Sequence, residues 1–340
     1  MSVLVTGGAG YIGAHVVRLL QQRGTECVVV DDLSTGAVER LGGAALVRAD
    51  VASPDAVPTL VEAMQEHRVE AVVHFAARKR VDESVARPAW YYQQNVTGLA
   101  NVLMAAQEAG VDRLVFSSSA AVYGEPSGDA VDEGSPTQPV NPYGETKLVG
   151  EWLVRDAVAA GALRGALALR YFNVAGAGWD DLGDPAVLNL VTMVLERLEQ
   201  GSAPKVFGTD YPTPDGSCVR DFVHVLDLAD AHVAALDHLA GGVPGFDALN
   251  VGTGQGASVL EVVTTLQRLT GAEPSTELLD RRAGDPAAVV ARVDRIRQVL
   301  GWEAKADLGQ TLESAVRAWG YARARAVVEP EDGTVLSSTR

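Results

Sequence analysis

A tyrosine and a lysine spaced one helical turn apart are the residues of this sequence best suited to acid–base chemistry. Tyr143 and Lys147 lie in the segment Asn-Pro-Tyr-Gly-Glu-Thr-Lys, and Pro142 is typical of the first turn of a helix. Residues four apart share a helix face, so the ammonium group should lie beside the phenol. A nearby positive charge lowers the pKa of a phenol, which predicts a proton shuttle at neutral pH. An ordinary helix with an exposed lysine would show the same spacing.

A serine run supplies a third candidate. Ser119 closes the segment Phe-Ser-Ser-Ser after a strand predicted over residues 112–117. Ligands of doubly wound sheets bind beyond the carboxyl ends of the strands, and a hydroxyl there can donate to a sugar hydroxyl or a carbonyl oxygen. A serine at this point can equally cap a helix or a turn. Ser119 therefore adds to the prediction only together with Tyr143 and Lys147.

A glycine-rich loop follows the first predicted strand, residues 2–6, and opens a predicted helix over 12–23. The loop reads Thr-Gly-Gly-Ala-Gly-Tyr-Ile-Gly, with glycines at 7, 10 and 13. These glycines permit a tight turn and let backbone N–H groups reach a pyrophosphate. Asp31 ends the second predicted strand, where a carboxylate accepts from the adenosine ribose and repels a 2′-phosphate. The combination predicts a dinucleotide site and favours NAD over NADP.

Strand–helix alternation predicts the fold that positions these residues. Uniformly apolar strands are expected at 2–6, 26–31, 44–48, 70–75, 112–117 and 164–170, and helices at 12–23, 54–67, 84–109 and 143–160. This pattern is typical of an α/β fold, a doubly wound parallel sheet of the Rossmann type. Further helices near 186–200, 227–240, 258–270 and 308–324 predict a smaller C-terminal α/β substrate lobe. We expect a cofactor domain at 1–173, a substrate lobe at 174–325 interleaved with late strands of the first domain, and a loose tail at 326–340.

Composition narrows the classes of function. The chain of 340 residues carries a net charge of −16, so a nucleic-acid backbone would be repelled. The six histidines show no metal-ligand spacing, and we expect no metal. No apolar run approaches about 18 residues, and the two cysteines, Cys27 and Cys218, do not suggest a disulfide framework. These features predict a cytoplasmic protein that binds neither nucleic acid nor membrane.

Several segments together resemble one family. They are Ser-Ser-Ser-Ala-Ala-Val-Tyr-Gly at 117–124, Asn-Pro-Tyr-Gly-Glu-Thr-Lys at 141–147, Arg-Tyr-Phe-Asn-Val-Ala-Gly-Ala at 170–177, Asp-Tyr-Pro-Thr-Pro-Asp-Gly at 210–216 and Val-Arg-Asp-Phe-Val-His-Val-Leu-Asp-Leu-Ala at 219–229. In this combination the chain resembles the UDP-glucose (UDP-galactose) 4-epimerases of the extended short-chain dehydrogenase/reductase family. The resemblance runs from about residue 2 to residue 320.

The resemblance implies roles for individual residues. Ser119 would position the 4-oxygen of a sugar, Tyr143 would be the acid/base, and Lys147 would lower the pKa of Tyr143 and bind the nicotinamide ribose. The implied cofactor contacts, several also placed by the strand ends, are Gly7, Gly10, Tyr11, Ile12, Gly13, Asp31, Asp50, Val51, Phe75, Ala76, Ala77, Lys79, Asn95, Tyr143, Lys147 and Tyr171. The implied substrate contacts are Lys79, Ser119, Phe172, Asn173, Asn189, Leu190, Phe207, Arg220, Arg282, Asp285 and Val289.

The implied activity is reversible inversion at C4 of a UDP-hexose through a 4-keto sugar, with tightly bound NAD. A nucleotide-sugar 4,6-dehydratase or decarboxylase is disfavoured, because Ser119-Ala120-Ala121 replaces the Thr-Asp-Glu of those enzymes. An epimerase acting on UDP-N-acetylhexosamine or UDP-uronic acid stays open, as does a non-catalytic NAD-binding regulator.

Two further expectations follow from the resemblance. Val289 stands at a pocket-wall position that is often tyrosine or a small residue, so the substrate range is in doubt. The long helices near 84–109 and 143–160 carry apolar residues that would pack two copies into a homodimer through a four-helix bundle. These residues are Trp90, Leu99, Leu103, Leu148, Trp152 and Leu153. The same faces would alternatively only cover the sheet.

Overall fold

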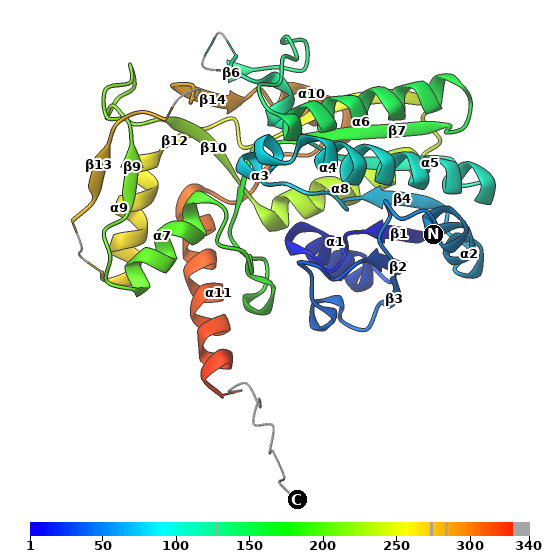
Figure 1. The fold of residues 1–340 in the computed structure, drawn as a ribbon, viewed down its shortest axis with the longest axis horizontal. Coiled ribbons are helices and arrows are strands. Elements are labelled where there is room, and N and C mark those ends of the chain that lie inside the picture. The colour runs from blue at the N-terminus through cyan, green and yellow to red at the C-terminus, as the bar shows by residue number, and fades with distance from the viewer. Residues whose placement is uncertain (127, 129, 273–274, 283–284, 329–340) are drawn as a thin grey trace, which may run out of the picture.

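A seven-stranded parallel sheet forms the centre of the protein (Figure 1). The computed structural model describes residues 1–126, 128, 130–272, 275–282 and 285–328. The strands are ordered β11-β7-β5-β4-β1-β2-β3. Their bounds are β1 Ser2–Thr6, β2 Glu26–Asp31, β3 Ala45–Arg48, β4 Ala71–His74, β5 Arg113–Ser119, β7 Gly165–Tyr171 and β11 Gly245–Val251. The order reverses between β1 and β4, which is the crevice where doubly wound sheets bind ligands. This architecture confirms the predicted fold class.

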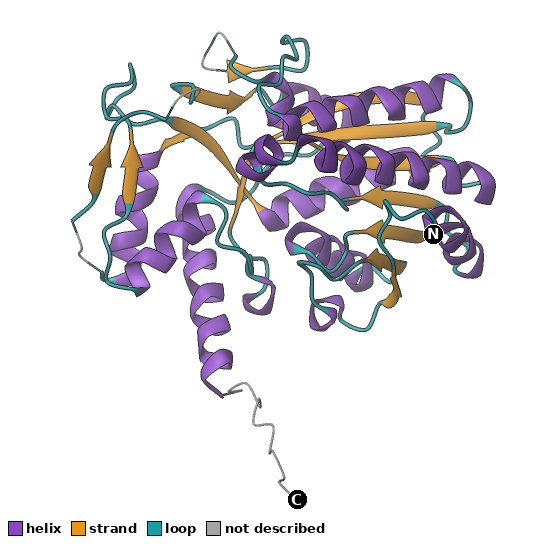
Figure 2. Ribbon diagram, in the orientation of Figure 1, coloured by secondary structure: helices purple, strands orange, loops and turns teal. Residues whose placement is uncertain are grey.

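Helices cover both faces of the sheet, as Figure 2 shows. Val3 and Val5 pack on one side of β1 and Leu4 on the other, because successive side chains of a strand point to opposite faces. The first face is covered by α1 (Tyr11–Gln22), α8 (Val225–Ala240) and α10 (Asp294–Leu300). The second is covered by α2 (Ala56–Glu66), α5 (Gly98–Ala109) and α6 (Pro142–Ala159). Both faces are buried, which explains why the strands are apolar throughout.

A smaller lobe has its own apolar core. Its strands are β6 (Ala130–Val131), β8 (Asn173–Ala175), β10 (Val219–His224), β12 (Gly256–Ser258) and β14 (Ala288–Ala291), with the separate pair β9 (Lys205–Phe207) and β13 (Glu277–Leu279). Helices α7 (Leu190–Glu199), α9 (Val259–Thr270) and α11 (Leu308–Val328) pack around Phe222 and Leu266. The lobe is interleaved with the main sheet, since β11 of the main sheet lies between the lobe strands β10 and β12 in the chain. The expected tail at 326–340 begins within α11, and residues 329–340 lie outside the described part of the chain.

The single helix expected over 84–109 is wrong in detail. The segment forms α3 (Val81–Ala86), α4 (Pro88–Tyr92), a π-helical turn at Gln93–Thr97 and then α5. Arg87 has φ −135° and ψ 55°, because the residue before a proline is driven out of the helical region. A π-turn inside a helix often marks a functional site, and this one carries Gln94 and Asn95.

No helix among residues 1–328 that the structure describes is long and apolar enough to cross a membrane.

Candidate active site

A cavity of about 470 Å³ opens at the carboxyl ends of the central strands. Every predicted cofactor residue except Asn95 lines it: Gly7, Gly10, Tyr11, Ile12, Gly13, Asp31, Asp50, Val51, Phe75, Ala76, Ala77, Lys79, Tyr143, Lys147 and Tyr171. The segment 184–188 of the smaller lobe contributes to its wall. Asn95 is buried behind the wall, where its amide bonds the Arg78 backbone and the Thr146 hydroxyl. The cavity therefore collects the glycine loop, the acidic strand end and the tyrosine–lysine pair.

The glycine loop has the close packing that a pyrophosphate cradle requires. A Cβ added to Gly13 would lie 2.3 Å from the Gly7 carbonyl oxygen, and one added to Gly7 would lie 2.7 Å from the Ala76 nitrogen. Gly7 also has φ +70°, a conformation that side chains rarely adopt. The loop ends at the N-terminus of α1, where backbone N–H groups and the helix dipole favour an anion. These residues fit the diphosphate of a dinucleotide.

Asp31 lies at the adenosine end expected for this fold. Its two carboxylate oxygens accept from the backbone N–H groups of Ala9 and Leu33, each at 2.9 Å. Burial raises the pKa of Asp31, and these backbone donors oppose the rise. The bonds fix the carboxylate at the end of β2 and leave further lone pairs for ribose hydroxyls. The geometry fits the predicted NAD selection.

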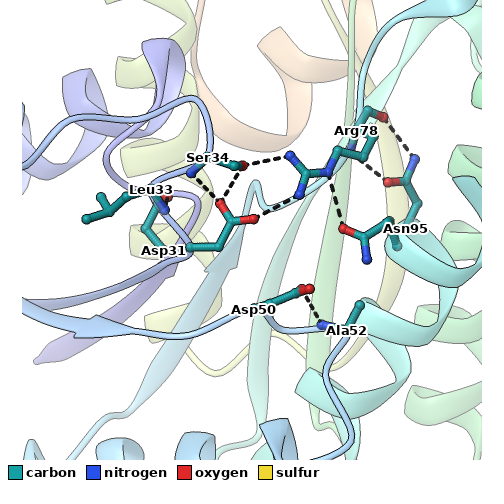
Figure 3. A network of polar contacts seen from close by, with 9 residues as sticks. Asp31, Leu33, Ser34, Asp50, Ala52, Arg78 and Asn95 are labelled. Atoms are coloured by element: carbon teal, nitrogen blue, oxygen red, sulfur yellow. Dashed lines mark hydrogen bonds and ion pairs between the residues drawn. The ribbon is translucent and has the colours of Figure 1, made fainter. Parts of the chain in front are cut away.

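An arginine missed by sequence reasoning lies beside Asp31 (Figure 3). Arg78 donates to the Asp32 carboxylate at 2.8 Å and to the Ser34 hydroxyl at 2.7 Å. Its partner Asp32 is 46 residues away in the chain. The sequence signal for this arginine was its position shortly after β4, beside the predicted cofactor contact Lys79, and that signal does not identify Asp32 as its partner.

Tyr143 and Lys147 lie on the first turns of α6, as predicted. The Asn141 side chain caps this helix by accepting from the Gly144 N–H at 2.9 Å, which sets where the helix begins. The buried Lys147 ammonium donates to the Ser117 carbonyl at 2.7 Å. Ser119 accepts from the Ala121 N–H at 3.2 Å, and its side chain is hydrogen-bonded to Tyr143. The three predicted catalytic side chains are thus held by adjacent ends of β5 and α6.

The predicted lowering of the Tyr143 pKa is wrong for the protein alone. Burial raises the pKa of Tyr143, and the hydrogen bond with Ser119 opposes the rise. Burial lowers the pKa of Lys147 to about 7, opposed by the charge of Glu151. Sequence spacing places the two side chains on one face, but it carries no information about how deeply they are buried, and desolvation disfavours both charged forms.

A buried ion pair follows Lys147 by one helical turn. Glu151 accepts two hydrogen bonds from Arg170, at 2.6 and 2.8 Å, and one from Ser118 at 2.5 Å. Arg170 also donates to the Tyr123 hydroxyl at 3.0 Å, which in turn donates to Asn250 at 2.7 Å. The network joins α6 to β5, β7 and β11 and so fixes the helix that carries the tyrosine and lysine. Sequence reasoning missed it as well.

The residues predicted for the diphosphate form two contacts in the smaller lobe. Arg220 donates to Asp285 at 3.1 Å and to the carbonyl oxygen of Pro286 at 2.9 Å. The Arg282 guanidinium lies 3.7 Å from the centre of the Phe207 ring. The Asp285 N–H donates to the Arg282 carbonyl at 3.3 Å, so the two contacts belong to one cluster.

The other predicted substrate residues cap a helix, begin a helix or strand, or pack in an apolar cluster. Asn189 caps α7, accepting from the Thr192 N–H at 3.1 Å, and Leu190 begins that helix. Phe172 is buried in a cluster against which Val289 packs. Asn173 is exposed and begins β8, which pairs with β10. None of these residues lines the cofactor cavity, whose described walls meet the lobe only at 184–188.

The described ranges contain no group of three or more His, Cys, Asp or Glu side chains placed to hold a metal ion.

Comparison with known proteins shows which family has this sequence and this fold. Residues 3–252 match the NAD dependent epimerase/dehydratase family. A UDP-glucose 4-epimerase of Azospirillum brasilense is 48% identical over 270 residues, which are 78% of this chain and 76% of that protein. A UDP-glucose 4-epimerase of Rhizobium meliloti (strain 1021) is 42% identical and covers 92% of this chain and 95% of that protein.

A solved structure agrees with the sequence comparison. The UDP-glucose-4-epimerase from Stenotrophomonas maltophila, with bound NAD and formylated UDP-arabinopyranose, superposes with a TM-score of 0.88. The two are 41% identical, and the alignment covers 96% of this chain and 99% of that one. The sequence match, the sheet order and the cavity all agree, and we conclude that the chain belongs to the NAD dependent epimerase/dehydratase family, among the UDP-glucose 4-epimerases.

Proposed function

We propose that this protein interconverts UDP-glucose and UDP-galactose by reversible inversion at C4, with NAD held in the cavity. The observation that carries the proposal is the meeting of the glycine loop, Asp31, Tyr143 and Lys147 in one cavity of about 470 Å³. The 4,6-dehydratase alternative lacks support, because Ala120 and Ala121 follow Ser119 where an acid pair would be needed.

NAD, when bound, supplies hydride acceptance and return at its nicotinamide ring, which is cationic when oxidised. The residues of the chain hold the substrate and move a proton. Tyr143 takes the proton of the sugar 4-hydroxyl at its phenolic oxygen and returns it after inversion through the 4-keto sugar. Ser119, bonded to Tyr143, orients the 4-oxygen. Lys147, held on the Ser117 carbonyl, provides the positive charge that favours the phenolate in the loaded site.

The test measures epimerisation without added cofactor. Purified protein is incubated with UDP-galactose, and the nucleotide sugars are separated and quantified; formation of UDP-glucose is expected. Tyr143→Phe should lower turnover by about 10²–10⁴-fold while retaining bound NAD, since a general acid–base group contributes about that much. Tyr321→Phe is the matched control, because Tyr321 is exposed on α11 and outside the cofactor cavity. Equal turnover of the two variants would contradict the role of Tyr143.

A broader substrate range is the second candidate, and Val289 supports it. This side chain packs against the cluster that contains Phe172, beside the proposed sugar site. Valine is smaller than tyrosine, so a wall that contains it leaves partial room for a 2-N-acetyl group. A misfit of this size changes the barrier by about 1–3 kcal/mol. We expect slow conversion of UDP-N-acetylglucosamine beside the main reaction. Absence of that conversion at high enzyme concentration would contradict the proposal.

A homodimer is the proposed assembly. Tyr92, Met104 and Trp152 are exposed apolar side chains on α4, α5 and α6, and α4 and α5 both pack against α6. Leu99 and Leu148 are buried within the single chain and therefore serve its own core. Light scattering at micromolar concentration should give twice the chain mass, and Trp152→Glu should give the monomer. A monomer mass for the unchanged protein would refute the assembly.

The cytoplasm is the proposed compartment. Cys27 and Cys218 are both free, which is typical of a reducing environment. Fractionation of the native host should place the enzyme with cytoplasmic markers, and recovery in the secreted or membrane fraction would contradict this.

A further inference from the structure

Arg78 lines the cofactor cavity and is held there by hydrogen bonds to three side chains (Figure 3). One terminal nitrogen donates to Ser34 at 2.7 Å, the other to Asp32 at 2.8 Å, and Nε donates to Gln94 at 3.2 Å. Its guanidinium lies 5.3 Å from the centre of the Trp90 ring. Arg78, Asp32, Ser34 and Gln94 all line the cavity. The guanidinium is therefore fixed in direction, at the end of the cavity where Asp31 lies.

The backbone of Arg78 is fixed too. Asn95 accepts from its N–H at 2.7 Å and donates to its carbonyl at 3.0 Å. Asn95 in turn bonds Thr146 on α6. The π-helical turn that carries Gln94 and Asn95 thus sets both the main chain and the side chain of the arginine. Arg78 is not a freely moving surface residue, although its side chain is 23% exposed.

The position of this arginine has a consequence for cofactor choice. Doubly wound sheets select NAD with an acidic residue on the ribose 2′-hydroxyl, and select NADP with a nearby arginine on the 2′-phosphate. This chain contains both elements: Asp31 at the end of β2, and Arg78, which forms an ion pair with the next residue, Asp32. Arginine binds phosphate through paired N–H groups. In this structure the two terminal nitrogens of Arg78 are engaged by Asp32 and Ser34.

The charges around Asp31 agree with this geometry. The largest effects on the pKa of Asp31 are burial, which raises it, and the two backbone donors, which lower it. The charge of Asp32 raises this pKa further, and the charge of Arg78 lowers it. Both groups are therefore close enough to act on a ligand that Asp31 binds. With Asp32 ionised, the three residues sum to a charge of −1; without it, they sum to zero and the arginine is left unpaired.

We propose that Asp32 is a second cofactor-selecting residue, which acts by holding Arg78 away from a 2′-phosphate. Asp31 repels the 2′-phosphate directly, whereas Asp32 keeps the Arg78 guanidinium from binding it. The proposal rests on the placement of the adenosine ribose at Asp31. The alternative is that the Asp32–Arg78 pair only braces two loops and has no influence on cofactor choice.

Cofactor content separates these possibilities. Wild type, Asp32→Asn, Arg78→Met and the double variant are expressed in the same host, purified without nucleotide, and denatured. NAD(H) and NADP(H) are then quantified by mass spectrometry. The asparagine keeps the shape and the acceptor for Ser34 but loses the charge that holds Arg78. Asp32→Ser is a second substitution at the same position, in case the first does not fold.

The expected pattern is specific. Asp32→Asn should raise the NADP(H) share at least about tenfold over wild type, while Asp31 keeps NAD(H) the larger fraction. Arg78→Met alone and Asp32→Asn/Arg78→Met should both stay at the wild-type share. An unchanged share in the Asp32 variants, or an equal rise in the double variant, would overturn the proposal. Wild-type protein with neither dinucleotide would instead contradict the proposed function.

Discussion

The buried ion pair between Glu151 and Arg170 predicts a large loss of stability when one partner is neutralised. Glu151 is 3% exposed and Arg170 6%, and three hydrogen bonds end on the carboxylate. Glu151→Gln keeps the size of the side chain but leaves the guanidinium buried without a counter-charge. Breaking a buried pair in this way costs about 3–5 kcal/mol of the free energy of unfolding. Because the network holds α6 against β5 and β7, the substitution should lower the free energy of unfolding of the whole cofactor domain.

A neighbouring pair on the same helix provides the control. Arg155 and Asp156 are 55% and 66% exposed, and a surface pair contributes only about 0–1 kcal/mol. Urea unfolding of Glu151→Gln and Asp156→Asn is followed by tryptophan fluorescence, with saturating NAD in each sample because a bound ligand stabilises the native state. Glu151→Leu/Arg170→Met, which removes both charges, should recover much of the loss. If Glu151→Gln unfolds within about 1 kcal/mol of the control, the reasoning from burial is refuted.

Three further outcomes are expected. Gly13→Ala should purify with little or no NAD, because its Cβ would lie 2.3 Å from the Gly7 carbonyl oxygen, and normal cofactor content would contradict the cradle. Burial lowers the pKa of Lys147 from 10.5 to about 7, so between these pH values the unfolded chain binds more protons and stability rises with pH; the urea midpoint of Lys147→Met should lack this rise, and parallel profiles would contradict it. Val289→Tyr should abolish conversion of UDP-N-acetylglucosamine while sparing UDP-galactose, and unchanged N-acetyl activity would show that this side chain lies outside the sugar site.

The local parts of the site could be predicted from the sequence because they depend on short spacings. The glycine loop, the acidic residue that ends β2, and the tyrosine–lysine pair on α6 each lie within a single strand–turn–helix segment. Their geometry follows from backbone preferences and from helix periodicity, which are encoded within a few residues. The alternation of apolar strands and amphipathic helices likewise predicted the doubly wound sheet. The break at Pro88 was readable by the same local rules but was missed.

Contacts between distant segments were decided only by the tertiary structure. Arg78 meets Asp32 across 46 residues, and Arg170 on β7 meets Glu151 on α6 across 19 residues. No periodicity marks such partners, because they come together only when the strands take their order. Burial depth is a tertiary property as well, which is why the direction of the Tyr143 pKa differed from its prediction. Local spacing determines which groups a site contains, whereas packing determines their partners and their charge, since both depend on how much water the fold removes.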